Sequence, residues 1–169
     1  MLGLGLLRPD PRHHDIGRGK LIFVCSGNIC RSPYAEAVAR RYGMRAVSCG
    51  TRAEPGGAAD ITAVSEAAQR GVDMSSHRST RWRDVELQAD DIVIAMQLRH
   101  ALAVLPRARA HLCPVLLFSS LLSEFAVIED PYGKAGWQFR SVFNLIDAGI
   151  TRIMQLRGLP TEGAAGQRR

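Results

Sequence analysis

A cysteine and an arginine with five residues between them form the most chemically informative stretch of the chain. Cys25 and Arg31 enclose a short polar loop, whose residues are Ser26, Gly27, Asn28, Ile29 and Cys30. The backbone N–H groups of such a loop can converge on an anion. The planar guanidinium of an arginine matches two oxygens of a phosphoryl group. A thiol beside that cation and a helix N-terminus favours its thiolate form, so Cys25 is a candidate nucleophile toward a bound phosphoryl group.

The spacing alone is weak, because this chain of 169 residues has four cysteines and many arginines. The simpler interpretation of Cys25 is a buried core cysteine. The flanking sequence favours the chemical interpretation, since an aliphatic run over 20–24 predicts a buried strand just before the loop. Ser32-Pro33 follows, with the proline where the first turn of a helix tolerates it and Ser32 as a possible N-cap.

Strands and helices are expected to alternate along the rest of the chain. The pattern indicates a three-layer αβα fold of the α/β class, whose middle layer is a four-stranded parallel sheet. The phosphate-binding loop then lies between the first strand and the first helix, at the sheet edge where open α/β sheets bind ligands. Pro106 is expected to end the third helix. The expected strands are 20–24, 45–49, 90–96 and 111–118, and the expected helices are 34–42, 58–70, 97–105 and one long helix around 137–154.

Length and composition indicate one domain over 20–157. Residues 1–19 and 158–169 are expected to be flexible extensions. No apolar run approaches the ~18 residues of a membrane helix, and the first residues lack the pattern of a signal peptide. We therefore expect a cytoplasmic protein with reduced thiols and no stable membrane insertion. The net charge of +6 comes from largely scattered arginines, and the chain has no recognised nucleic-acid-binding module, so no nucleic-acid partner is expected.

Four segments of the chain resemble the low-molecular-weight protein tyrosine phosphatases. The first runs from Val24 to Pro33 with Ala-Glu shortly after it, and Ser48-Cys49-Gly50-Thr51 is the second. Asp91–Met96 is similar to the central strand of the family, and Glu129-Asp130-Pro131-Tyr132-Gly133 is similar to its acid loop. Within the family, the chain looks most like the bacterial branch paired with tyrosine autokinases that control exopolysaccharide export. The resemblance covers about 20–154.

The resemblance implies a two-step hydrolysis of phosphotyrosine with neither cofactor nor metal. Cys25 would attack phosphorus and Arg31 would stabilise the transition state. Asp130 would protonate the leaving phenolate and then activate water; from the sequence alone, an Asp-Pro turn is the simpler interpretation of this residue. Tyr132 would form one wall of the cleft, and the loop residues 26–30 would bind the phosphoryl group. The other aromatic wall of many members is missing, because Glu54 stands at that position.

The resemblance also implies groups that support the loop. Ser32 would donate to the Cys25 thiolate, and Asn28, in a left-handed turn, would bond with Ser48 and His77. Cys30 would trap oxidised Cys25 as a reversible disulfide, although a packing role for Cys30 is equally compatible with the sequence.

Three alternatives to a phosphatase remain at this point. An arsenate reductase of the same fold needs a close cysteine pair in the second half of the chain, which contains only Cys113. A non-enzymatic anion-binding module would need neither Cys25 nor Asp130, and a nucleic-acid binder rests on charge alone. The expected partner is a phosphotyrosine protein such as a tyrosine autokinase, bound by a monomer or weak dimer.

Overall fold

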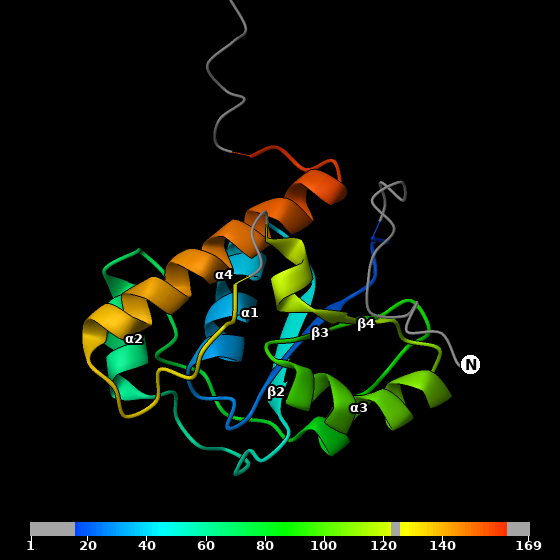
Figure 1. The fold of residues 1–169 in the computed structure, drawn as a ribbon, viewed down its shortest axis with the longest axis horizontal. Helices are drawn as coiled ribbons and strands as arrows, with labels where there is room; N and C mark the ends of the chain where they lie inside the picture. The colour runs from blue at the N-terminus through cyan, green and yellow to red at the C-terminus, as the bar shows by residue number, and fades with distance from the viewer. Residues whose placement is uncertain (1–15, 123–125, 162–169) are drawn as a thin grey trace, which may run out of the picture.

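The computed structural model describes residues 16–122 and 126–161. Strands and helices alternate as the sequence pattern predicts (Figure 1). The first 15 residues and the last eight, on which most of the two expected extensions fall, lie outside the described residues. The elements in chain order are β1 (Leu21–Cys25), α1 (Arg31–Arg41), β2 (Ala46–Gly50), α2 (Ile61–Ala68), η2 (Trp82–Asp84), β3 (Ile92–Ala95), α3 (Leu98–Ala110), β4 (Val115–Leu117), η3 (Phe118–Leu121) and α4 (Gly136–Leu156).

The four strands form one parallel sheet in the order β2-β1-β3-β4. Alternate residues of β1 face opposite layers: Leu21 and Phe23 join a core built with α1 and α4, whereas Ile22 and Val24 join a core built with α3. Figure 1 shows α1 and α4 on one side of the sheet and α3 on the other. The expected α/β fold with helices on both faces and a loop between β1 and α1 is confirmed.

Two local expectations were wrong. Helix α1 begins at Arg31 with Cys30 at its N-cap position, so Ser32 lies inside the helix and does not cap it. Helix α3 continues through Pro106 to Ala110. Proline in a helix removes the hydrogen bond to the carbonyl four residues earlier, here that of Leu102, whose side chain is 59% exposed. This is the solvent side of the helix, where water can bond the released carbonyl.

The packed unit includes residues before β1. Ile16 packs against the core of α1 and α4, and the Gly19 carbonyl accepts a hydrogen bond from the Arg157 guanidinium at 2.8 Å. Within the described part of the chain, no helix has both the length and the hydropathy needed to cross a bilayer.

Candidate active site

The loop between β1 and α1 encloses a hollow at the carboxyl end of the sheet. Asn28 takes a left-handed conformation with φ 56°, as expected, and turns the backbone back on itself. Gly50 at the end of β2 permits this close packing: a Cβ there would lie 2.3 Å from the Ser26 carbonyl oxygen and 3.0 Å from the Asn28 nitrogen. The hollow has a volume of about 170 Å³. Its lining residues are Cys25, Ser26, Gly27, Ile29, Cys30, Arg31, Asp130 and Tyr132.

The Cys25 sulfur lies beside a buried hydroxyl group. Its Sγ is 2.9 Å from Ser32 Oγ, and Asn28 Nδ2 donates to the same hydroxyl at 2.9 Å. A thiolate can only accept, so Ser32 donates its proton to the sulfur whenever Cys25 is ionised. The sequence-predicted contact between Ser32 and Cys25 is therefore present in the structure.

A buried hydrogen-bond network holds Asn28 in its left-handed turn. Its Nδ2 also donates to Ser48 Oγ at 2.8 Å, and its carbonyl accepts from His77 Nε2 at 2.8 Å. Sequence reasoning placed Ser48 and His77 here, but it missed two further members. Thr80 N donates to Asn28 Oδ1 at 2.8 Å, and Ser48 donates to the Glu36 carboxylate at 2.6 Å. The Ala-Glu pair that follows the loop was a signal for Glu36, whereas nothing in the sequence marks Thr80.

Arg31 is buried at the wall of the hollow and already holds two acceptors. Its Nη1 donates to the Ile128 carbonyl at 3.1 Å, and its Nη2 donates to Asp130 Oδ2 at 2.5 Å. The Arg31 Nε is also buried and has no hydrogen-bond partner among the described residues. A buried polar group is normally satisfied, so this guanidinium retains a donor that suits a bound anion.

The acid loop brings Asp130 and Tyr132 to the same hollow as Cys25. Tyr132 is 63% exposed and so is not a core residue. The Arg99 guanidinium at the start of α3 lies 3.7 Å from Asp130 Oδ2. Glu54, at the position of the missing aromatic wall, is exposed and does not line the hollow.

Cys30 is buried at the edge of this hollow. Burial raises the pKa of its thiol, and the nearby Asp60 carboxylate raises it further. Cys30 is therefore a neutral thiol at ordinary pH. Cys49 and Cys113 belong to the core between the sheet and α3, so both have a packing role.

His100 on α3 contacts the loop at Ser26, and sequence reasoning missed it. Its Nε2 lies 2.9 Å from Ser26 Oγ and accepts from Arg99 Nε at 3.4 Å. Because a guanidinium only donates, this nitrogen carries a lone pair, and the Ser26 hydroxyl donates to it. Burial lowers the pKa of His100 to about 4, with the Arg31 and Arg99 charges adding to the effect. His100 is thus a neutral acceptor at pH 7.

No group of three His, Cys, Asp or Glu side chains in residues 16–122 and 126–161 is placed to hold a metal ion. The geometry joins a thiol, an arginine and a carboxylate around one hollow of about 170 Å³. Such a set suits the transfer of a phosphoryl group through a covalent intermediate.

The sequence profile for low molecular weight phosphotyrosine protein phosphatases matches residues 20–162. The low molecular weight protein-tyrosine-phosphatase Wzb of Escherichia coli is 33% identical over 137 residues, which cover 80% of this chain and 92% of that protein. A probable low molecular weight protein-tyrosine-phosphatase, EpsP of Ralstonia solanacearum, is 31% identical, with coverage of 77% and 90%.

Solved structures show the same architecture. The Erwinia amylovora tyrosine phosphatase AmsI superposes with a TM-score of 0.71 at 27% identity, over 85% of this chain and 94% of that chain. Vibrio vulnificus Wzb, in complex with benzylphosphonate, gives 0.68 at 29% identity, with coverage of 80% and 96%. An arginine phosphatase, YwlE of Geobacillus stearothermophilus, gives 0.70 at 24% identity over 89% and 99%, which shows a shared fold.

Proposed function

This chain belongs to the low molecular weight phosphotyrosine protein phosphatase family and is a protein-tyrosine phosphatase, and from that premise we propose how its residues act. Cys25 is the nucleophile, Arg31 binds the phosphoryl oxygens, and Asp130 is the acid and base. The observation that carries this assignment is that all three line one hollow of about 170 Å³. Tyr132 lines it too and packs against the substrate ring.

In the first step, the Cys25 thiolate attacks phosphorus and the bond from phosphorus to the tyrosine oxygen breaks. Asp130 gives its proton to that oxygen, because a tyrosinate is a poor leaving group without it. The Arg31 guanidinium and the N–H groups of residues 26–30 stabilise the charge on the equatorial oxygens. The products of this step are the free tyrosine side chain and a phosphoryl group on sulfur.

In the second step, water attacks phosphorus while Asp130 takes one of its protons. The sulfur–phosphorus bond breaks and inorganic phosphate leaves. Ser32, whose Oγ is 2.9 Å from the sulfur, donates to the departing thiolate and so makes it a better leaving group. The network that joins Asn28, Ser48 and His77 keeps the loop in shape through both steps.

We further propose that the substrate is a bacterial tyrosine autokinase linked to polysaccharide export. The motif resemblance to that branch supports this, as do the relatives Wzb and EpsP. The net charge of +6 and the exposed Arg99 beside the hollow favour an acidic phosphotyrosine segment. We place the reaction in the cytoplasm. We propose that residues 20–157 form the single phosphatase domain and that the protein acts as a monomer or weak dimer.

The substrate class is tested with three peptides of one sequence that carry phosphotyrosine, phosphoserine or phosphoarginine. We expect hydrolysis of the phosphotyrosine peptide to dominate and to vanish in Cys25→Ser. Cys113→Ser is the matched control, because it removes a buried cysteine outside the hollow. Faster hydrolysis of phosphoarginine or phosphoserine would contradict the assignment.

The autokinase proposal has a separate test. Purified, tyrosine-phosphorylated autokinase is mixed with Cys25→Ser, and binding is compared with that of the dephosphorylated kinase. Phosphorylation-dependent binding that inorganic vanadate displaces supports the proposal, whereas equal binding of both kinase forms contradicts it.

A further inference from the structure

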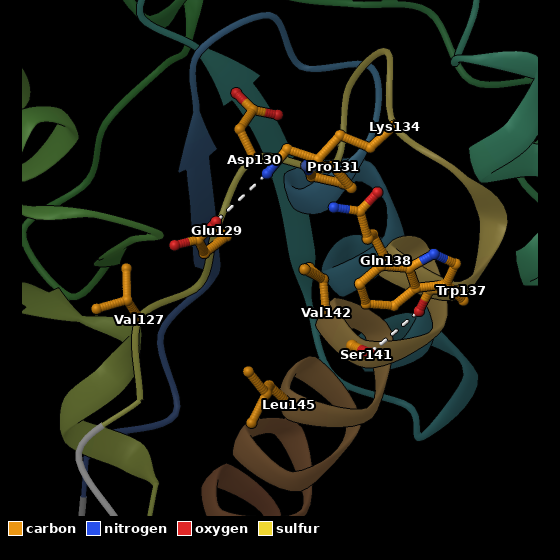
Figure 2. A pocket seen from close by; sticks show the side chains of 10 residues that line it. All are labelled: Val127, Glu129, Asp130, Pro131, Lys134, Trp137, Gln138, Ser141, Val142 and Leu145. Atoms are coloured by element: carbon orange, nitrogen blue, oxygen red, sulfur yellow. Dashed lines mark hydrogen bonds and ion pairs between the residues drawn. The ribbon is translucent and has the colours of Figure 1, made fainter.

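A second hollow, which we call the α4 groove, lies between the acid loop and the first turns of α4 (Figure 2). Its volume is about 230 Å³. Asp130 lines both hollows, and Figure 2 shows its carboxylate pointing away from the groove. The acid loop is therefore a partition with the proposed catalytic hollow on one side and the groove on the other. The apolar lining of the groove is Val127, Pro131, Trp137, Val142 and Leu145.

Two large apolar side chains at the groove are exposed. Trp137 is 60% exposed on the first turn of α4, and Val127 is 55% exposed. The core-facing residues of the same helix, such as Phe139 and Phe143, are buried, so Trp137 is not needed to hold α4 against the sheet. Exposed apolar groups around a hollow mark a binding surface.

The charges around the groove are already paired. Glu129 Oε2 and Lys134 Nζ form an ion pair at 3.3 Å, which Figure 2 shows beside Pro131. The Asp130 carboxylate is held by Arg31. An ionic occupant would therefore find no unpaired partner in this lining. An apolar cavity of about 150 Å³ accepts benzene, so the groove accommodates a branched aliphatic or aromatic side chain.

We propose that the α4 groove is a subsite of the protein substrate and binds an apolar side chain close in sequence to the phosphotyrosine. This rests on the proposed phosphotyrosine hydrolysis, and it adds a determinant of which tyrosines are chosen. When phosphotyrosine occupies the catalytic hollow, the adjoining peptide crosses the acid loop at the exposed Tyr132. An extended peptide advances about 3.3 Å per residue, so a side chain within about three residues of the phosphotyrosine reaches the groove.

The test uses a peptide series in which one leucine is moved through the three positions on either side of phosphotyrosine, in an otherwise Gly/Ser background. We expect kcat/KM to peak at one or two leucine positions. Trp137→Ala should abolish that peak, a loss of roughly tenfold for burial of one leucine side chain. Ser141→Phe, which fills the groove from its exposed rim, should produce the same selective loss. Neither variant should change hydrolysis of 4-nitrophenyl phosphate, which has no flanking residues.

The matched control is Leu102→Ala, which removes an apolar side chain of similar exposure from α3. It should leave the leucine preference intact. A leucine preference that survives both groove variants, or the absence of any preference in the unmodified protein, would overturn the subsite. Failure of the unmodified protein to hydrolyse both 4-nitrophenyl phosphate and every peptide would instead overturn the proposed function.

Discussion

The Arg31 guanidinium donates to the Asp130 carboxylate at 2.5 Å, so the anion-binding group and the proposed acid are paired with each other. A phosphoryl group that binds Arg31 through both the unpartnered Nε and Nη2 therefore competes with Asp130 for the Nη2 donor. Arg99, whose guanidinium is 3.7 Å from the same Asp130 oxygen, remains as a second cationic partner. In the proposed mechanism, this competition releases the Asp130 carboxyl group from Arg31, and its protonated form then faces the leaving oxygen.

This competition predicts that Asp130→Ala binds oxyanions more tightly. The substitution removes both the competing acceptor and a negative charge near the bound anion. Asp130 is partly exposed, so water screens the effect, and we expect roughly a threefold to tenfold lower Kd for vanadate. Calorimetric titration measures it. A weaker affinity in the variant would show that the ion pair does not compete with the anion.

The acid role of Asp130 predicts a dependence on the leaving group. Asp130→Asn cannot give a proton to the leaving oxygen, so turnover should fall by about 10²–10⁴ for phenyl phosphate. The loss should be much smaller for 4-nitrophenyl phosphate, whose phenolate leaves unaided. Initial rates across a series of substituted aryl phosphates measure this trend. Equal losses across the series would exclude Asp130 as the acid.

The lowered pKa of His100 leads us to predict that the stability of the protein depends on pH. Its folded pKa of about 4 lies below the ordinary value of 6.5. As pH drops below about 6.5 toward 4, His100 is protonated in the unfolded chain but stays neutral in the native protein. The free energy of unfolding therefore falls over this pH range. Between pH 7 and pH 5 this amounts to about 1–2 kcal/mol.

Urea unfolding of the unmodified protein and of His100→Gln, at both pH values, isolates this contribution. The variant should lose less stability on acidification by that amount. His111→Gln, which removes an exposed histidine at the end of α3, should behave like the unmodified protein. An equal loss in His100→Gln and the unmodified protein would show that His100 is protonated normally in the fold.

The position of Cys30 beside Cys25 at the hollow leads us to predict that the enzyme regains activity after oxidation. Peroxide converts Cys25 to a sulfenic acid. The Cys30 thiol then attacks this sulfur, its proton leaves with the sulfenic hydroxyl as water, and the resulting disulfide is reduced by dithiothreitol. Cys30→Ser should therefore regain much less activity than Cys113→Ser after the same treatment. The measurement is activity after peroxide and then dithiothreitol. Equal recovery of the two variants would assign Cys30 a packing role only.

Local sequence was sufficient where the chemistry and the backbone requirement fall in one segment. The residues from Cys25 to Ser32 carry the proposed nucleophile, the buried arginine and the left-handed Asn28 within a single strand-loop-helix unit. Alternation of strands and helices was also enough to predict the parallel sheet, because buried parallel strands form continuous aliphatic runs.

Contacts between distant segments were not predictable from residue types. The sequence around His100 does not indicate that α3 brings this residue to Ser26. The pairing of Arg31 with Asp130 likewise depends on the path of the acid loop across the edge of the sheet. The prediction that α3 ends at Pro106 was wrong, because proline breaks a helix only where the lost hydrogen bond cannot be replaced. The α4 groove arises from two segments that pack only after folding.

The most direct test of the account is rapid-mix hydrolysis of 4-nitrophenyl phosphate with EDTA present, followed by mass spectrometry of the quenched protein. When hydrolysis of the intermediate is the slower step, we predict a burst of nitrophenolate that approaches one equivalent per protein and phosphate attached to Cys25. Cys25→Ser should show neither the phosphorylated cysteine nor turnover, while Cys113→Ser should match the unmodified protein. Turnover that persists in Cys25→Ser would contradict the central claim that Cys25 is the nucleophile.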